Sequence, residues 1–207
     1  MSRVETRISL VRHGLVHNPQ QIFYQRMPRF RLADEGKDQA RAAAELLKGE
    51  KIAKIFSSPL LRAQQTAKII AGPHKMKVTT TVLLNEVHTP YEGRTYADLD
   101  ARKWDLYSES RPPYEQPLQV WSRVQKFIRR TRRAYPGQHV VAVSHGDVIA
   151  FTVLWAMGLA VDVKVARTEL PKLDPIANYI AHCSISTMTF LTDDMGEMPQ
   201  FEYRRPY

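Results

Sequence analysis

The apolar positions of the chain fall into short runs that alternate with longer amphipathic segments. Residues 6–11, 54–57, 78–83 and 139–143 form runs rich in Val, Ile, Thr and Phe, which predict strands. Periodic apolar positions predict helices over 34–48, 60–71, 98–107, 116–135 and 147–157, and residues 186–191 and 202–204 suit late or edge strands. Strands spaced by helices favour βαβ units, and therefore a mainly parallel sheet with helices on both faces.

The first predicted helix shows how helix ends and faces are identified from the sequence. Asp34 is its candidate N-cap, because an aspartate oxygen can accept a hydrogen bond from the free N–H groups of the first turn. The face that this helix buries is predicted to contain Ala40, Ala43, Ala44 and Leu47.

Length and composition indicate one globular unit. A chain of 207 residues with 43% hydrophobic content is long enough for one sizeable core, so residues 1–207 are predicted to form a single domain. Cys183 is the only cysteine, which excludes an intramolecular disulfide and suits a reducing compartment. The charged start of the chain has no apolar core of a signal peptide, and no stretch approaches the ~18 apolar residues of a membrane span. We therefore expect a cytoplasmic protein with no membrane partner.

The net charge of +9 raises the question of nucleic-acid binding, because basic surfaces attract polyanions. The basic residues are spread along the chain, however, and the densest run, at 129–133, lies at the end of a predicted helix. Cations complement the helix dipole there, so a solvated helix end is the favoured interpretation. No zinc-finger spacing or RNA-binding strand motif supports the alternative.

Two predicted strands are each followed by a His-Gly turn. Arg12-His13-Gly14 follows the strand at 6–11, and Ser144-His145-Gly146 follows the strand at 139–143. Open α/β folds bind ligands at the carboxyl edge of the sheet, where these turns would place two imidazoles and an arginine. The pair of turns indicates an active site that handles an anion.

Two further segments carry candidate catalytic groups. Arg62 falls in the first turn of the helix after the second strand, where backbone N–H groups also favour anions. Glu86 follows the third strand among apolar residues, which would raise its pKa enough for it to donate a proton near neutrality. Glu92 lies in the same loop and is a rival for that role. Taken singly, each has an ordinary alternative, a surface arginine or an exposed loop glutamate.

Together these segments resemble the histidine phosphatase superfamily, which has the phosphoglycerate-mutase-like fold. The family has an Arg-His-Gly triplet after its first strand, a Ser-x-x-x-Arg-x-x-x-Thr-Ala segment, a donor acid followed by Glu-Gly, and a late Ser/Thr-His-Gly. This chain has the four segments in the same order, at residues 12–14, at residues 58–67, at Glu86 with Glu92-Gly93, and at residues 144–146. Four motifs in register are far more specific than any one of them.

The resemblance implies a three-layer α/β/α sandwich and a role for each site residue. His13 would be the nucleophile that becomes a phosphohistidine, and Glu86 would protonate the departing alkoxide and then activate water. Arg12, Arg62 and His145 would hold the phosphoryl oxygens, and Gly14, Asn18 and Gly146 would line the phosphate site. No metal or other cofactor is implied, and the other histidines show no HExxH-type spacing. The implied function is a metal-independent phosphomonoesterase acting on a small phosphorylated metabolite.

The chain also departs from the family pattern. Leu15-Val16 follows the triplet where many members have Glu-Thr or Glu-Ser, and Asn18 lies six residues after Arg12 rather than seven. A substrate segment of the mutases corresponds here to residues 22–25, and the chain is shorter than typical mutases. These features favour a phosphatase. A phosphoglycerate-type phosphomutase, a non-catalytic phospho-ligand binder and a nucleic-acid-binding protein are the alternatives.

Substrate identity and assembly are less determined by the sequence. The loop at 26–31 and the segment at 107–117, with Arg111, would form a basic and partly aromatic rim that suits a second anionic group or a ring. Surface loops with solvated arginines are the alternative. An exposed apolar surface around Trp155 and Met157 would support a homodimer.

Overall fold

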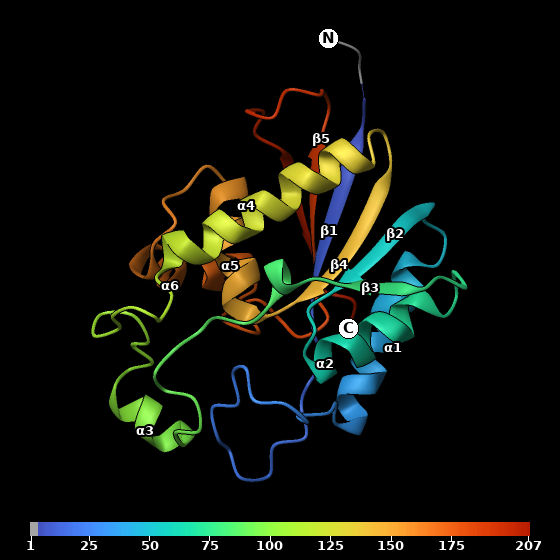
Figure 1. Ribbon diagram of the computed structural model, residues 1–207. Coiled ribbons are helices and arrows are strands. Elements are labelled where there is room, and N and C mark those ends of the chain that lie inside the picture. Colours follow the sequence, from blue (N-terminus) through green and yellow to red (C-terminus); the bar gives the residue numbers. More distant parts are fainter. Residues whose placement is uncertain (1–3) are drawn as a thin grey trace.

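One six-stranded sheet organises the computed structural model, which describes residues 4–207 (Figure 1). The strands are β1 (Thr6–Arg12), β2 (Ile52–Ser57), β3 (Val78–Thr80), β4 (His139–Ser144), β5 (Ile185–Phe190) and β6 (Gln200–Arg204). Their order is β3-β2-β4-β1-β5-β6, and β3, β2, β4 and β1 pair in parallel. β5 is antiparallel to β1, and β6 is antiparallel to β5. The predicted mainly parallel sheet is confirmed.

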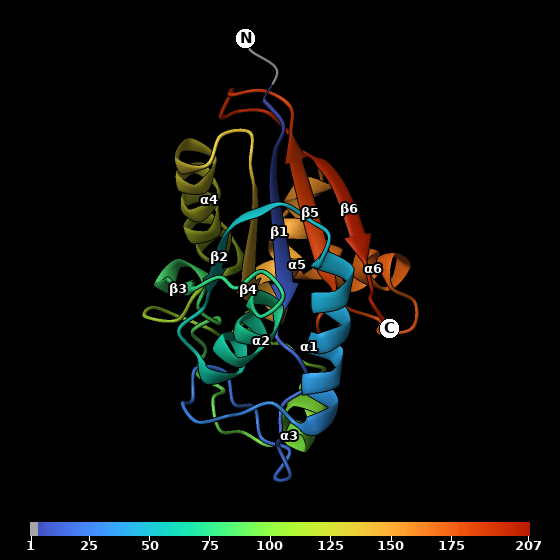
Figure 2. The same cartoon turned by 90° about the vertical axis from the view of Figure 1, so that its right-hand side faces the viewer.

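Helices cover both faces of this sheet (Figures 1 and 2). The helices are α1 (Asp34–Leu47), α2 (Leu61–Ala71), α3 (Tyr96–Ala101), α4 (Pro117–Ala134), α5 (Gly146–Ala156) and α6 (Val163–Leu173). One core lies under α1 and α2 and includes Val11 and Val143, whereas the other lies under α4, α5 and α6 and includes Leu10 and Ala142. Neighbouring residues of one strand enter opposite cores because side chains alternate across a strand. The architecture is the predicted α/β/α sandwich.

Several element boundaries differ from the sequence predictions. Asp34 was predicted as the N-cap of α1 but is its first residue. The N-cap is Ala33, which makes no side-chain capping bond. β3 ends at Thr80, and a 3-10 turn over Val82–Leu84 replaces the rest of the predicted strand. The predicted helix at 98–107 is instead α3, which ends at Ala101 because Lys103 and Trp104 have positive φ angles of 52° and 53°. α6 has no predicted counterpart, since Pro171 inside it argues against a helix.

Two surface predictions also need correction. Arg129, Arg130 and Arg133 are exposed, as predicted, but Arg132 is only 4% exposed. Its guanidinium carbon lies 3.9 Å from the centre of the Phe190 ring, and it donates a hydrogen bond of 3.0 Å to the carbonyl of Thr192. That arginine therefore packs the end of α4 against β5.

The predicted apolar surface near the end of α5 is smaller than expected. Trp155 is partly buried and stacks on Trp121 of α4 with ring centres 4.6 Å apart, while Met157 is 39% exposed. Between residues 4 and 207, none of the helices has the length and apolar character that crossing a membrane requires. Residues 1–3, part of the charged start, lie outside the described residues.

Candidate active site

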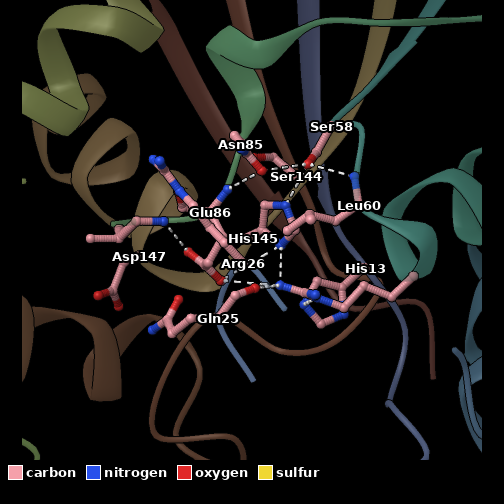
Figure 3. A network of polar contacts seen from close by, with 12 residues as sticks. His13, Gln25, Arg26, Ser58, Leu60, Asn85, Glu86, Ser144, His145 and Asp147 are labelled. Atoms are coloured by element: carbon pink, nitrogen blue, oxygen red, sulfur yellow. Dashed lines mark hydrogen bonds and ion pairs between the residues drawn. The ribbon is translucent and has the colours of Figure 1, made fainter. Parts of the chain in front are cut away.

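The ends of β1 and β4 place two imidazoles side by side. Arg12 is opposite Ser144 in the parallel register, so the residues that follow, His13 and His145, leave the sheet at neighbouring positions. Their ring centres are 5.2 Å apart, and both side chains are buried. The predicted meeting of these two turns at the carboxyl edge of the sheet is confirmed (Figure 3).

Arg62 connects the two imidazoles. It is the second residue of α2 and is fully buried. Its Nε donates to Nε2 of His13 at 3.1 Å, and its Nη2 donates to Nδ1 of His145 at 3.2 Å. The sequence placed Arg62 in a first helical turn, and the structure brings it to the site as predicted.

The contacts of His13 assign its tautomer. Nδ1 lies 2.8 Å from the carbonyl oxygen of Gly14, which only accepts, so Nδ1 carries the proton. Nε2 is then the unprotonated nitrogen. Burial, followed by the positive charge of Arg62, lowers the pKa of His13 well below its ordinary value. His13 is therefore a neutral imidazole with a lone pair on Nε2 near neutral pH.

His145 has the opposite tautomer. Because Arg62 only donates, Nδ1 of His145 accepts, and Nε2–H donates to the Ser58 hydroxyl at 2.8 Å. Ser58 in turn donates to the Asn85 side-chain oxygen at 3.5 Å, and it follows β2 directly (Figure 3). Burial, then Arg62, lowers the pKa of His145 well below its ordinary value. Ser58 thus orients the second imidazole.

Glu86 is the carboxyl group that lies beside this network. One of its oxygens is 3.6 Å from Nδ1 of His145 and 3.9 Å from Nη2 of Arg62, while the other accepts from the Val87 amide at 2.8 Å. Burial raises the pKa of Glu86 to about 7, against the opposing effect of the Arg62 charge. The rival Glu92 is exposed, and its carboxylate accepts from the Arg26 amide instead. Of the two candidates, the structure places Glu86 at the imidazoles.

Two buried guanidinium N–H groups beside His13 lack hydrogen-bond acceptors. Among the described residues, Nε of Arg12 and Nη1 of Arg62 have no partner, although both atoms are shielded from solvent. Arg12 is held by a bond from its Nη1 to the Ile180 carbonyl at 2.5 Å. Unpaired buried donors are costly, and charged ones strongly favour an anionic acceptor. Arg12 lines the same cavity as His13, and Arg62 bonds to His13, so these two donors favour an anion at the His13 end of the cavity.

Of the three residues predicted to line the phosphate site, only Gly146 lines the cavity at His13. A Cβ at Gly146 would lie 3.0 Å from Cε1 of Tyr179 and 3.6 Å from the guanidinium carbon of Arg12, so the glycine permits their close approach. The Gly14 amide donates to the Thr66 hydroxyl, and a Cβ there would meet the backbone of α1. Asn18 instead shapes its own loop by donating to the Ile22 carbonyl and the Tyr96 hydroxyl.

The cavity holds polar groups that the sequence did not single out. Asp147 directly follows Gly146, and its carboxylate accepts hydrogen bonds from the hydroxyls of Tyr107 and Tyr179. His182 also lies near, with its ring centre 5.8 Å from that of His13. The only signal for Asp147 was its place after the His-Gly turn. Tyr179 and His182 lie in an irregular segment without any motif.

Of the predicted basic and partly aromatic rim, Tyr107 lines the cavity, whereas Arg26 and Arg111 do not. Nε of Arg26 donates to the Glu86 carbonyl at 2.7 Å, and its Nη2 pairs with Glu115 at 2.8 Å, so Arg26 supports the Glu86 loop. Arg111 is exposed and bonds to backbone carbonyls of its own segment. The segment at 22–25 does reach the cavity, through Phe23, Tyr24 and Gln25.

His13, Glu86 and His145 also have the spacing of a metal site, because each offers a ligand atom within 4.8 Å of the others. Two imidazoles and a carboxylate would suit zinc. Arg62, however, donates to the very nitrogens that would bind the ion, and its charge repels a cation. The residues present therefore do not fit a resident metal.

Comparisons with known proteins agree with this geometry. Residues 8–174 match the Histidine phosphatase superfamily (branch 1). An uncharacterised protein of Mycobacterium tuberculosis, Rv0525, is 31% identical over 98% of this chain and 97% of its own length. The adenosylcobalamin/alpha-ribazole phosphatase of Escherichia coli is 27% identical over 74% of this chain and 80% of its own. The solved mycobacterial glucosyl-3-phosphoglycerate phosphatase Rv2419c shares the fold, with a TM-score of 0.75, 24% identity, and coverage of 96% of this chain and 97% of that one.

Proposed function

The chain belongs to the histidine phosphatase superfamily and is a phosphoric monoester hydrolase, and we propose that it acts through a phosphohistidine formed at His13. The observation that carries the proposal is the nucleophile beside its anion site. Neutral His13 shares a cavity with Arg12 and bonds to Arg62, and each of the two arginines keeps an N–H group without a partner. A loose phosphoryl transition state gains most from fixed donors of this kind.

In the first step, phosphoryl oxygens accept hydrogen bonds from Arg12 and Arg62, and the bond from Arg62 Nε shifts from His13 to an oxygen. Nε2 of His13 then forms the P–N bond while the ester P–O bond breaks. Glu86, whose pKa of about 7 keeps a large fraction of the carboxyl protonated near neutrality, gives its proton to the leaving oxygen. The products are an alcohol and phosphorylated His13.

In the second step, water replaces the alcohol. The Glu86 carboxylate takes a proton from this water, the water oxygen forms a bond to phosphorus, and the P–N bond breaks. Inorganic phosphate leaves, His13 recovers its lone pair and Glu86 is again protonated. His145, which Ser58 orients, stays beside the same phosphoryl group through both steps. No metal or other cofactor takes part in either step.

The phosphohistidine route predicts activity in EDTA that depends on one histidine. We would measure hydrolysis of para-nitrophenyl phosphate by the wild type, His13→Ala and the control His17→Ala, which alters an exposed histidine. Loss of the nucleophile is expected to lower kcat at least ~1000-fold, whereas the control keeps wild-type activity. Mass spectrometry after rapid quenching should detect an acid-labile phosphoryl group on the wild type. Turnover by His13→Ala, or turnover without that group, would refute the route.

Glu86→Gln separates the two roles of the carboxyl group. Para-nitrophenolate leaves readily without a proton, so the variant is expected to form the phosphoenzyme and to be slow in its hydrolysis. For an alkyl phosphate, whose leaving oxygen needs the proton, formation of the phosphoenzyme should be slow as well. Equal losses of the first step with both substrates would contradict a proton donor at Glu86.

A further inference from the structure

The cavity at His13 continues into a space with aromatic and aliphatic walls. We call it the aromatic chamber, and its walls include Phe23, Tyr96, Trp104, Tyr107, Phe151 and Val163. We propose that this chamber binds the leaving group of the substrate, and that this group is an apolar, ring-containing group without a second anionic charge. This inference rests on the proposed function, because the phosphate position defines where the leaving group lies.

The chamber is assembled from four separate segments, and three of them supply rings that contact one another. Phe23 of the loop after β1 packs against Trp104 with ring centres 6.0 Å apart, and Tyr96 of α3 lies 5.4 Å from the same ring. Tyr107 packs edge-on against Phe151 of α5 at 5.7 Å. Since the rings support each other, the walls form a built surface for another ring rather than isolated exposed side chains.

Backbone bonds hold the first two segments together. The Phe23 amide donates to the Arg94 carbonyl at 2.7 Å, and the Tyr96 amide donates to the Gln21 carbonyl at 2.8 Å. In Figure 1, the loop that follows β1 and the segment around α3 lie together beyond the carboxyl edge of the sheet. They therefore cover the phosphate site as one unit.

Beyond the phosphate position, the described residues that line the cavity include one further cation, Arg167, and it is not buried. Arg12 and Glu86 belong to the phosphate position. Asp147 is anionic and already accepts from two tyrosine hydroxyls, so its charge would repel a carboxylate or a second phosphate. Arg167 is exposed and donates to the Lys103 carbonyl at 2.9 Å. A second anion in the chamber would lose its water without gaining a buried partner, which is costly.

The size of the cavity suits a leaving group that carries a ring. Its volume of about 480 Å³ lies within the range of ~300–1,000 Å³ that is typical of small-molecule sites. A phenylalkyl or bicyclic aromatic group fits this space.

Matched phosphonates test the chamber without requiring turnover. Calorimetry would compare 2-phenylethylphosphonate with 3-phosphonopropanoate, which share the same anion and differ in an apolar or a carboxylate tail. We expect the phenyl compound to bind at least about tenfold more tightly, because its ring is buried and the carboxylate is unpaired. Equal affinities, or tighter binding of the carboxylate compound, would overturn the inference.

A charge placed in the wall should reverse the preference. Val163→Lys puts a cation at a half-buried wall position, and Val82→Lys makes the same change at a side chain that is 71% exposed and outside the cavity. The first variant should lose at least about tenfold in affinity for 2-phenylethylphosphonate and gain affinity for 3-phosphonopropanoate, while the control keeps both affinities. An unchanged preference in Val163→Lys would show that the tail lies elsewhere.

Turnover distinguishes failure of this inference from failure of the proposed function. The substrates would be 2-phenylethyl phosphate and 3-phosphoglycerate, which both release a primary alcohol, so the chemical step is comparable. A higher kcat/KM for 3-phosphoglycerate would overturn the inference and leave the hydrolase intact. If neither ester is hydrolysed while the phosphonates bind in the expected order, the proposed phosphatase mechanism is refuted and the proposed apolar binding site is supported.

Discussion

Glu86→Gln replaces a buried carboxyl group by a neutral amide of the same shape. Burial raises the pKa of Glu86 from an ordinary value of 4.5 to about 7. At about 1.4 kcal/mol for each pH unit, this shift corresponds to about 3.5 kcal/mol. The folded chain binds the proton more tightly than the unfolded chain does. The protonated carboxyl group of Glu86 therefore stabilises the folded chain fully below pH 4.5, and this stabilisation is lost as the pH rises through 7.

The variant should not show this loss, because glutamine does not titrate and its side-chain oxygen still accepts from the Val87 amide. Urea denaturation of both proteins between pH 5 and 8.5 would measure the free energy of unfolding. We expect the variant to gain about 2.5 kcal/mol over the wild type across this interval. Glu92→Gln, at an exposed position, is the matched control. Its free energy of unfolding should differ from that of the wild type by the same amount at every pH.

A flat difference for Glu86→Gln would refute the reasoning. It would mean that the charge of Arg62, 3.9 Å from the carboxylate, outweighs burial and keeps Glu86 ionised throughout. An ionised Glu86 would have no proton for the leaving group, so the same experiment would also remove the proposed acid.

Two further predictions concern catalysis and packing. For an alkyl phosphate, kcat of the wild type should fall about tenfold per pH unit above about pH 7 as Glu86 loses its proton, and a flat profile to pH 9 would contradict this acid. Gly14→Ala should lower the free energy of unfolding by about 1–3 kcal/mol or more, because its Cβ would lie 2.3 Å from the Gly36 carbonyl oxygen. A Cβ at Gly49 would meet nothing within 4 Å, so Gly49→Ala should change the free energy of unfolding by under about 0.5 kcal/mol. Urea denaturation would measure both variants, and an equal loss of stability in the two would disprove the packing argument.

The meeting of the two imidazoles could be predicted from local sequence. His13 and His145 each follow an apolar strand, and parallel strands end at the same edge of a sheet, so the two imidazoles had to meet if the strands were neighbours. Arg62 was found for a similar reason, since it begins a helix after β2. These residues are fixed by strand ends and helix starts, which local patterns mark.

The boundary errors have local causes as well. β3 was overestimated because a β-branched run does not reveal where its strand partner stops, and β2 pairs only with Val78–Thr80. Asp34 was a good N-cap by residue type, but the chain enters α1 one residue earlier. Neighbours in space, rather than propensity, decided both ends.

Sequence alone therefore determined the alternating α/β plan, the two His-Gly turns and the acid-bearing loop, because each depends on local periodicity or on a short motif. Tertiary structure alone decided that Asp147 is held by Tyr107 and Tyr179, which lie 40 and 32 residues away in the chain. It also decided the walls of the aromatic chamber. Those contacts join irregular segments with no repeating pattern, so they exist only after the loops have packed over the carboxyl edge of the sheet.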